Sequence, residues 1–313
     1  MLKIIRPLTY FSLALFSFSS CTTPRSVLSS GKVVPKNTIR GGINYTFNIA
    51  SSPIKQSTRS IYNFANNYGN KDTIYYDQTV SDLGASLMAY CLDPITFTNE
   101  YYLRFGLGHR MDMGYRNSGD AHGVDVMYQF LGSTGTFKDS EYKGMYGSVG
   151  FQYAHQSFKF INNRVLNKFE RLFGFNMRRQ DFSIPLIFSK SWGPEERTGC
   201  FSFGVIYTHS FIKYKIQPKG IYEHIDPAEN SLPPQLLKPI EGKLNFGSYG
   251  TFINLKVGVR YVFFNFSLTA YYQNYGKYQL IGGETTSLEG FSVVPSYGVQ
   301  FNIPVKKKKK PVD

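Results

Sequence analysis

The chain has 313 residues, which is enough for one large domain or two small ones. Hydrophobic residues make up 42% of the sequence and aromatic residues 17%. No stretch beyond the N-terminal region reaches the ~18 unbroken apolar residues of a transmembrane helix, which excludes a protein that crosses a membrane with helices. The formal net charge is +14, a balance that suits anionic surfaces.

The first 20 residues have the pattern of a secretory signal. Lys3 and Arg6 form a short basic region, an apolar run follows over residues 8–18, and two serines stand directly before Cys21. The run is shorter than the ~20 residues that span a bilayer, and a cysteine at this place is typical of a bacterial lipoprotein signal. We therefore predict a signal peptide over 1–20 and a lipid on Cys21. The alternative is an ordinary cleaved signal with an incidental cysteine.

Export of the protein leads to predictions about its partners and about the two ends of the mature chain. Exported proteins rarely meet nucleic acid, so we predict no nucleic-acid partner. Residues 21–37 predict a lipidated, flexible tether, and residues 305–313 a basic periplasmic tail. The tail contains Lys306, Lys307, Lys308, Lys309 and Lys310. Each lysine near an anionic membrane surface contributes about 1 kcal/mol of attraction, so we expect these side chains to contact lipid headgroups; a solvated tail is the alternative.

Between these ends, segments of about ten residues alternate apolar and polar side chains, which is the period of a β-strand. The segments are 44–49, 100–108, 110–116, 123–131, 147–156, 181–190, 200–211, 252–263, 265–274 and 291–304. A membrane barrel needs this alternation because one face of each strand meets lipid and the other meets the lumen. The pattern predicts an all-β fold, a transmembrane antiparallel up-and-down barrel of about ten strands over residues 38–304.

One segment, residues 81–93, alternates poorly. Read as a helix, it places Leu83 and Leu87 on one face, with Ser81 as a possible N-cap. An eleventh strand would also break the even strand number of bacterial single-chain barrels. We therefore favour a helix that ends before Pro94.

Connection lengths predict the side of the membrane on which each loop lies. The three longest connections lie near residues 50–97, 159–180 and 217–247. If the strands run up and down, all three fall at one end, which is the external end in outer-membrane barrels. We expect short helices in these external loops, including one at 161–173, and tight internal turns near 106–110 and at Phe264–Asn265.

A soluble β-sandwich would also show alternating strands. Its strands usually have ~5–6 residues, whereas several segments here reach the ~9–11 residues that cross a membrane at a tilt. The barrel is therefore favoured over the sandwich.

The chain resembles the outer-membrane β-barrel lipoproteins of the Bacteroidota. The resemblance rests on the signal before Cys21, on GGINYTFNI and AYCLDP, and on YYLRFGLGHRMDMGYR followed by GVDVMYQFLG. It implies an outer-membrane location and outer-membrane lipids as partners, with other envelope proteins as further candidates. In that phylum acidic residues after the lipid cysteine are associated with surface export, and their absence after Cys21 predicts a periplasmic-side anchor.

The strand phase predicts charges of both signs inside the barrel. The lumen-facing set is Arg40, Glu100, Arg104, Asp112, Arg116, Asp125, Lys256 and Arg260. Unpaired buried charge is costly, and a barrel of about ten strands is just above the size that side chains can fill. We predict an ion-pair network that closes the lumen and a structural or accessory role in the outer membrane. A narrow channel for small solutes is the alternative.

Catalysis is the third hypothesis about the function of the chain. Omptin-type proteases are also ten-stranded barrels with Asp and His at the external rim, and the candidates here are Asp120 with His122 and His224 with Asp226. Such spacings are common in loops, and no nucleophile elbow, HExxH motif or phosphate-binding loop is present. We predict no enzyme, no cofactor and no metal site. Cys91 and Cys200 are expected to be two buried thiols rather than a disulfide.

Overall fold

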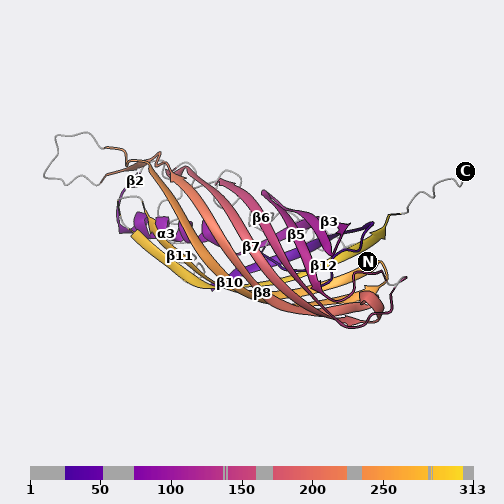
Figure 1. Ribbon diagram of the computed structural model, residues 1–313. Helices are drawn as coiled ribbons and strands as arrows, with labels where there is room; N and C mark the ends of the chain where they lie inside the picture. Colours follow the sequence, from indigo (N-terminus) through magenta and orange to yellow (C-terminus); the bar gives the residue numbers. More distant parts are fainter. Residues whose placement is uncertain are drawn as a thin grey trace, which may run out of the picture.

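The computed structural model describes residues 25–51, 74–136, 138, 140–159, 172–223, 235–280, 283 and 285–305. The predicted signal peptide, Cys21, the tail lysines and residues 161–171 of the helix predicted at 161–173 lie outside this range. Ten antiparallel strands form one closed barrel in the order β1-β12-β11-β10-β8-β7-β6-β5-β4-β3 (Figure 1). The predicted barrel is confirmed, and the β-sandwich is wrong because a single sheet closes on itself.

Each segment that the alternation predicted overlaps a barrel strand, but the segment 110–116 begins in a turn, and the segment 252–263 spans the turn between β10 and β11. The barrel strands are β1 (Thr38–Ala50), β3 (Thr96–Gly108), β4 (Met111–Ser118), β5 (Ala121–Leu131), β6 (Met145–Lys159), β7 (Phe175–Trp192), β8 (Gly199–Ile216), β10 (Ile240–Val259), β11 (Val262–Gln279) and β12 (Thr285–Pro304). Short strands β2 (Ile74–Tyr75) and β9 (Ile221–Tyr222) pair in parallel outside the barrel. The long strands β7, β8, β10, β11 and β12 rise further than β3 to β5 at one end (Figure 1).

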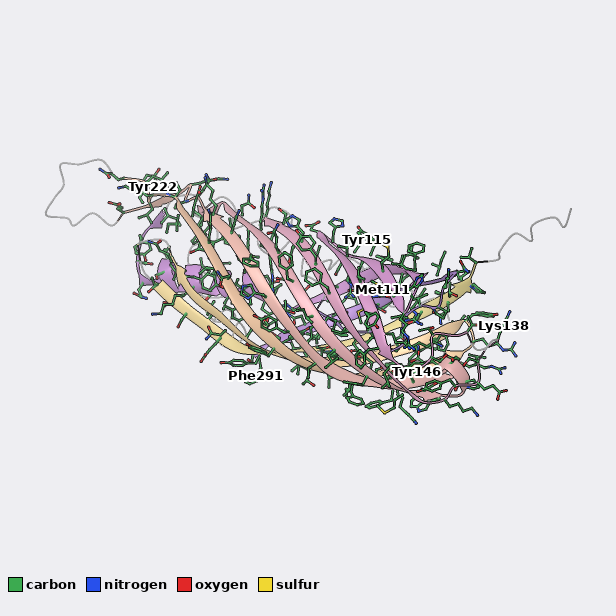
Figure 2. The ribbon with its side chains drawn as sticks, viewed as in Figure 1. Met111, Tyr115, Lys138, Tyr146, Tyr222 and Phe291 are labelled. Carbon is green, nitrogen blue, oxygen red and sulfur yellow. The ribbon has the colours of Figure 1, made fainter. Side chains whose placement is uncertain are left out.

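Side chains alternate between the two faces of the wall, with the large apolar ones outside. In β5, Val124 and Val126 are 51% and 39% exposed, whereas Asp125 and Gln129 between and beyond them are buried. The same inversion runs around the barrel, and Met111, Tyr115 and Phe291 all project from its outer face (Figure 2). Over much of the barrel the interior is the polar side of the wall, and an apolar cluster that includes Met177, Ile212 and Phe246 occupies one end of it.

The two ends of the barrel differ. One end has two-residue turns at His109–Arg110 and Arg260–Tyr261, and we call it the turn end. His109, Arg110 and Arg260 have φ of 52°, 64° and 57°, the left-handed values of hairpin turns that match the strand twist. The turn predicted at Phe264–Asn265 is therefore wrong by four residues, because Arg260 takes the left-handed conformation and both predicted residues lie in β11.

The other end holds helix α3 (Gln78–Leu92), and we call it the α3 end (Figure 1). The predicted helix is confirmed, but its N-cap is Asp77, whose side chain accepts a hydrogen bond from Val80 N, and not Ser81. Apolar residues of α3 pack against the inner wall of β7, β8, β10, β11 and β12. No helix among the described residues is long and apolar enough to cross a membrane.

Candidate functional site

The interior of the barrel is occupied by the chain's own residues 25–37, which we call the N-terminal segment. Arg25 lies at the α3 end, where its Nη1 is 3.1 Å from Asp93, the C-cap residue of α3, and its carbonyl oxygen accepts a 2.7 Å hydrogen bond from Tyr271 Oη of β11. At the turn end, Val34 N donates a 2.7 Å bond to Asp112 Oδ2 on β4. The segment therefore runs along the lumen, from the α3 end to the turn end, before it reverses into β1.

The contacts of the segment come from several strands. Inward-facing side chains of β11, β10, β7 and β5 bind its backbone, in the pairs Ser267–Val27, Asn254–Ser29, Ser189–Gly31 and Gln129–Val33. At Gly106 a Cβ atom would lie 2.1 Å from Pro35 O, so only glycine allows this approach of the segment to β3. The flexible tether predicted for 21–37 is wrong over residues 25–35, because they are held against the barrel wall.

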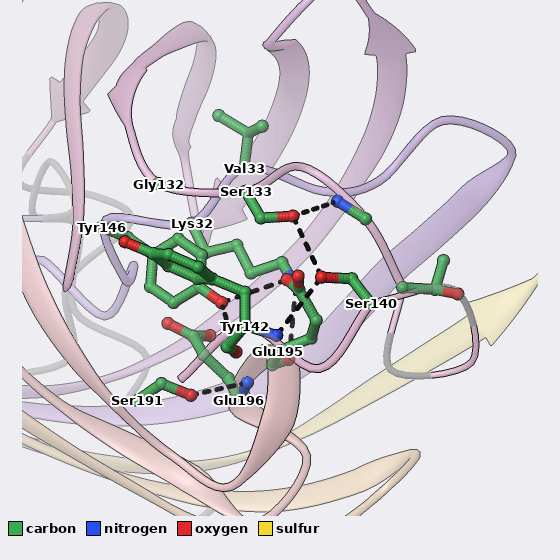
Figure 3. A network of polar contacts seen from close by, with 12 residues as sticks. Lys32, Val33, Gly132, Ser133, Ser140, Tyr142, Tyr146, Ser191, Glu195 and Glu196 are labelled. Atoms are coloured by element: carbon green, nitrogen blue, oxygen red, sulfur yellow. Dashed lines mark hydrogen bonds and ion pairs between the residues drawn. The ribbon is translucent and has the colours of Figure 1, made fainter. Parts of the chain in front are cut away.

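A cluster of buried charges closes the turn end. Lys32 of the segment pairs with Glu195, and Lys256 of β10 pairs with Glu196. Both glutamates lie in the turn η2 (Pro194–Glu196), and all four side chains are at most 7% exposed. We call Lys32, Glu195, Glu196 and Lys256 the turn-end cluster, and Figure 3 shows the first three of these residues.

Hydroxyl groups surround the two carboxylates of this cluster. Tyr146 Oη donates a 3.0 Å bond to Glu195 Oε2, and Ser30 and Ser189 donate bonds of 3.0 and 3.2 Å to Glu196. Figure 3 shows Tyr146 beside Lys32 and Glu195, and Glu196 beside Ser191. Each buried carboxylate is thus both paired and hydrogen-bonded, as buried charges must be.

The backbone of η2 is strained at both glutamates. Glu195 and Glu196 have φ of 52° and 59°. Non-glycine residues in this region cost roughly 1–3 kcal/mol of conformational energy each, which the surrounding contacts must offset.

The charges of the turn-end cluster shift the pKa values of its members. Burial raises the pKa of Glu196, but Lys256 and Lys32 outweigh it and hold the pKa below its usual value of 4.5. Burial lowers the pKa of Lys32, and the two glutamates offset only part of that effect.

A second buried carboxylate, Asp93, joins α3 to the segment and the wall. Its side chain lies 3.1 Å from Arg25 Nη1 and accepts bonds of 2.6 Å from Tyr275 Oη and 2.5 Å from Asn48 Nδ2. Gln273 and Ser292 also bind it. Burial alone would raise the pKa of Asp93, but Arg25 and these donors hold it below its usual value.

Most of the predicted lumen charges meet inside the barrel. Arg104 lies 2.5 Å from Asp112 and 2.7 Å from Asp125, and Arg116 lies 3.2 Å from Asp125 and 3.9 Å from Glu100. These five residues form a network along β3, β4 and β5, on the wall that flanks the N-terminal segment.

The other three predicted lumen residues have different surroundings. Lys256 belongs to the turn-end cluster, and Arg40 is buried with two neutral acceptors, Asn302 Oδ1 and Lys32 O. Arg260 is exposed in the turn between β10 and β11. Its predicted place in the lumen is wrong because the strand ends one residue earlier, at Val259.

Sequence reasoning missed Arg25, Lys32, Asp93, Glu195 and Glu196. Two signals were available. Val27, Val33 and Val34 are unusual in a solvated tether, and all three are at most 3% exposed. Two adjacent acids follow Gly193-Pro194 in a turn that otherwise needs none.

The catalytic candidates do not form a site among the described residues. The His122 ring lies on the outer wall at the β4–β5 turn, where its Nδ1 is 2.8 Å from Tyr115 Oη and 3.1 Å from Asn117 Nδ2. His224 and Asp226 lie outside the described range. Within that range, no three His, Cys, Asp or Glu residues could together hold a metal ion. Cys91 and Cys200 are free and buried, in agreement with the predicted thiols.

The space left around the N-terminal segment is small. Two cavities beside it, one lined by Arg25 and Asp181 and one by Ser29 and Glu100, have volumes of about 20 Å³ each. That is close to the ~10–15 Å³ needed for a single water. A larger cavity of about 90 Å³ lies at the turn end, beside the turn-end cluster.

Comparisons with known proteins give only distant likenesses. No family model matches the chain, and no curated protein matches it. The structure is similar to Ail, the attachment invasion locus protein of Yersinia pestis, at 8% identity and a TM-score of 0.31, over 86% of this chain and 99% of Ail. It is also similar to Neisserial surface protein A (8%, 0.28; 84% and 96% covered) and to OprG of Pseudomonas aeruginosa (7%, 0.28; 88% and 99% covered). TM-scores of this size assign no function, so the barrel rests on its own strand topology.

Proposed function

We propose that the protein is an outer-membrane β-barrel with a structural or accessory role, and that its own N-terminal segment closes the lumen. The observation that carries the proposal is the inverted wall, with large apolar side chains outside and polar ones inside. Contiguous apolar surface of this extent is not stable in water. A closed barrel with an even number of strands is the form in which bacterial chains cross a membrane with strands.

The filled lumen supports closure over conduction. The segment is bound by at least four strands, and two cavities along its length have room for about one water each, while the cavity of about 90 Å³ lies at its turn-end limit, beside Lys32 and Pro35. Salt-bridged side chains occupy both the β3–β5 wall and the turn end. A narrow channel would need a continuous hydrated path along these residues.

The lipid on Cys21 belongs to the same proposal. The signal before Cys21 and the resemblance to Bacteroidota lipoproteins support it. The path of the segment changes one expectation, because Arg25 lies against Asp93 at the α3 end. A periplasmic-side anchor beside the short turns therefore draws no support from the described residues. Mass spectrometry of the mature N-terminal peptide would detect the acyl chains on Cys21, and a free N-terminal thiol would contradict the lipid.

The single tryptophan offers a direct test of membrane insertion. Trp192 is 38% exposed at the turn-end limit of β7, where it stands opposite Gly199, and Phe203 is 41% exposed midway along β8 between Gly199 and Tyr207. In reconstituted vesicles, we expect Trp192 fluorescence to be quenched most by lipids brominated near the headgroup. In a Trp192→Phe, Phe203→Trp variant, lipids brominated deep in the acyl chain should quench most. Emission that no brominated lipid quenches would overturn the proposal.

A further inference from the structure

Three basic side chains form a row across the outer face of the barrel near the α3 end. Arg178 on β7 stands directly opposite Lys213 on β8, and Lys213 stands directly opposite Lys243 on β10. All three are exposed, and none has a hydrogen-bond or ion-pair partner among the described residues. We call Arg178, Lys213 and Lys243 the basic row.

Such a row does not stabilise the sheet by itself. Like charges directly opposite one another on neighbouring strands are destabilising. Two residues further toward the α3 end, β8 and β10 carry opposite charges instead, where Lys215 stands opposite Glu241 and pairs with it at 2.5 Å. Among the described residues the basic row has no such acid, so its charge is available to a ligand.

The wall behind the basic row is rigid. The inward neighbours Met177, Ile212 and Tyr214 are buried in the apolar cluster that holds α3. The three cations therefore project from a packed part of the barrel, and their spacing is fixed by the strand register.

The depth of the basic row matches a membrane interface. Toward the turn end, the outer face becomes aromatic, with Phe182 opposite His209 and Tyr207 opposite Tyr249. Aromatic belts mark the membrane–water boundary. Phe182 is four residues from Arg178, which is about 14 Å along a strand and about 10 Å along the membrane normal at a tilt of ~45°. This places the basic row at the level of the headgroups or just beyond them.

We propose that the basic row binds the phosphate groups of anionic lipid headgroups in the leaflet at the α3 end. This rests on the proposed function, because it requires the barrel to span a membrane. The planar fork of Arg178 matches phosphate oxygens with two hydrogen bonds, and the two ammonium groups supply further donors. A bound phosphate also removes the mutual repulsion of the three cations.

The test compares lipid retention by three proteins in vesicles of phosphatidylcholine with a minor share of phosphatidylglycerol. They are the wild type, the variant Arg178→Gln, Lys213→Gln, Lys243→Gln, and a control with equal charge loss at the turn end, Lys138→Gln, Lys143→Gln, Arg260→Gln. After detergent extraction, native mass spectrometry counts the phosphatidylglycerol that stays bound. We expect the basic-row variant to bind it about 100-fold more weakly than the wild type, since three cations are lost. The control should bind like the wild type.

Equal retention by the wild type and the basic-row variant would overturn the proposal, and so would an equal loss in the control. Competition by inorganic phosphate at millimolar concentration would instead indicate a site for the free ion, which also contradicts a lipid site. Heat-modifiable migration on gels verifies that each variant is folded. Trp192 quenching in the same vesicles separates the two proposals: if it is absent, the barrel is not in the membrane, and if it is present without selective lipid loss, only the basic-row proposal fails.

Discussion

At the residue scale, the turn-end cluster is the most constrained part of the molecule. Two consecutive non-glycine residues, Glu195 and Glu196, hold left-handed backbone conformations. Their carboxylates bind cations from two distant parts of the chain, Lys32 and Lys256. The ion pairs offset the backbone strain, and they also fix the N-terminal segment to the rim of the barrel.

Removing one of these charges should destabilise the protein strongly. In Glu196→Gln, the buried ammonium of Lys256 loses its counter-ion, and breaking a buried pair costs roughly 3–5 kcal/mol. Denaturant titration of the reconstituted protein, followed by heat-modifiable migration, measures the change. The control is Glu241→Gln, whose exposed pair with Lys215 should contribute no measurable stability. Equal effects of the two substitutions would contradict a structural role for the turn-end cluster.

Acid should act through the same carboxylate. The pKa of Glu196 is lower in the folded state than its usual value of 4.5, so its contribution is fully present above pH 4.5. It is lost as the pH falls through the lowered folded-state pKa. We expect the stability difference between wild type and Glu196→Gln to shrink steadily below pH 4.5. A difference that stays constant down to pH 2 would contradict this account.

At the element scale, α3 acts as a cap on the lumen that Asp93 fastens. Asp93 binds Arg25, Asn48 and Tyr275 while the apolar face of α3 packs on the wall. Two kinds of contact therefore hold the helix, and only the polar one reaches the N-terminal segment.

Asp93→Ala should loosen α3 without opening the barrel wall. Cys91 lies in α3 at 3% exposure, and Cys200 is fully buried in β8. In the variant we expect maleimide to label Cys91 at least tenfold faster than in the wild type, while Cys200 stays unreactive. The single variant Cys200→Ser, which keeps Asp93, gives the rate at which Cys91 is labelled when α3 is fastened. Labelling of both thiols at the same rate would indicate general unfolding and contradict a local role for Asp93.

The strands could be predicted from sequence, and the N-terminal segment could not. Each strand faces two different environments, so its period of two is visible in the residues themselves, as in Val124, Asp125 and Val126. The segment makes no ladder and has no period. Its partners, such as Asn254 for Ser29 and Ser267 for Val27, are more than 200 residues away.

The same distinction applies to the candidate site, where ion pairs between strands could be predicted and ion pairs with the N-terminal segment could not. Arg104, Asp112 and Asp125 could be predicted as partners because the strand phase turns them to one face and short turns make β3, β4 and β5 neighbours. The pairs Arg25–Asp93 and Lys32–Glu195 depend on where the segment runs, which no local pattern encodes. Arg260 was misplaced because a strand end shifts by a few residues without any change in the alternation.

At the scale of the whole molecule, the wall of the barrel is closed and its interior is filled. Strand pairing closes the wall from β1 to β12, and the N-terminal segment with α3 fills the interior. The charged interior residues pair with one another and with the segment. Under the proposed function, the apolar outer face contacts lipid and the filled lumen does not conduct.

Single-channel recording in planar bilayers tests this account most directly. The protein is compared with a variant that lacks residues 26–35, and heat-modifiable migration verifies that both are folded. We predict no conductance steps at any voltage for the intact protein, and stable steps once the segment is removed. Stable conductance steps from the intact protein would contradict the closed barrel.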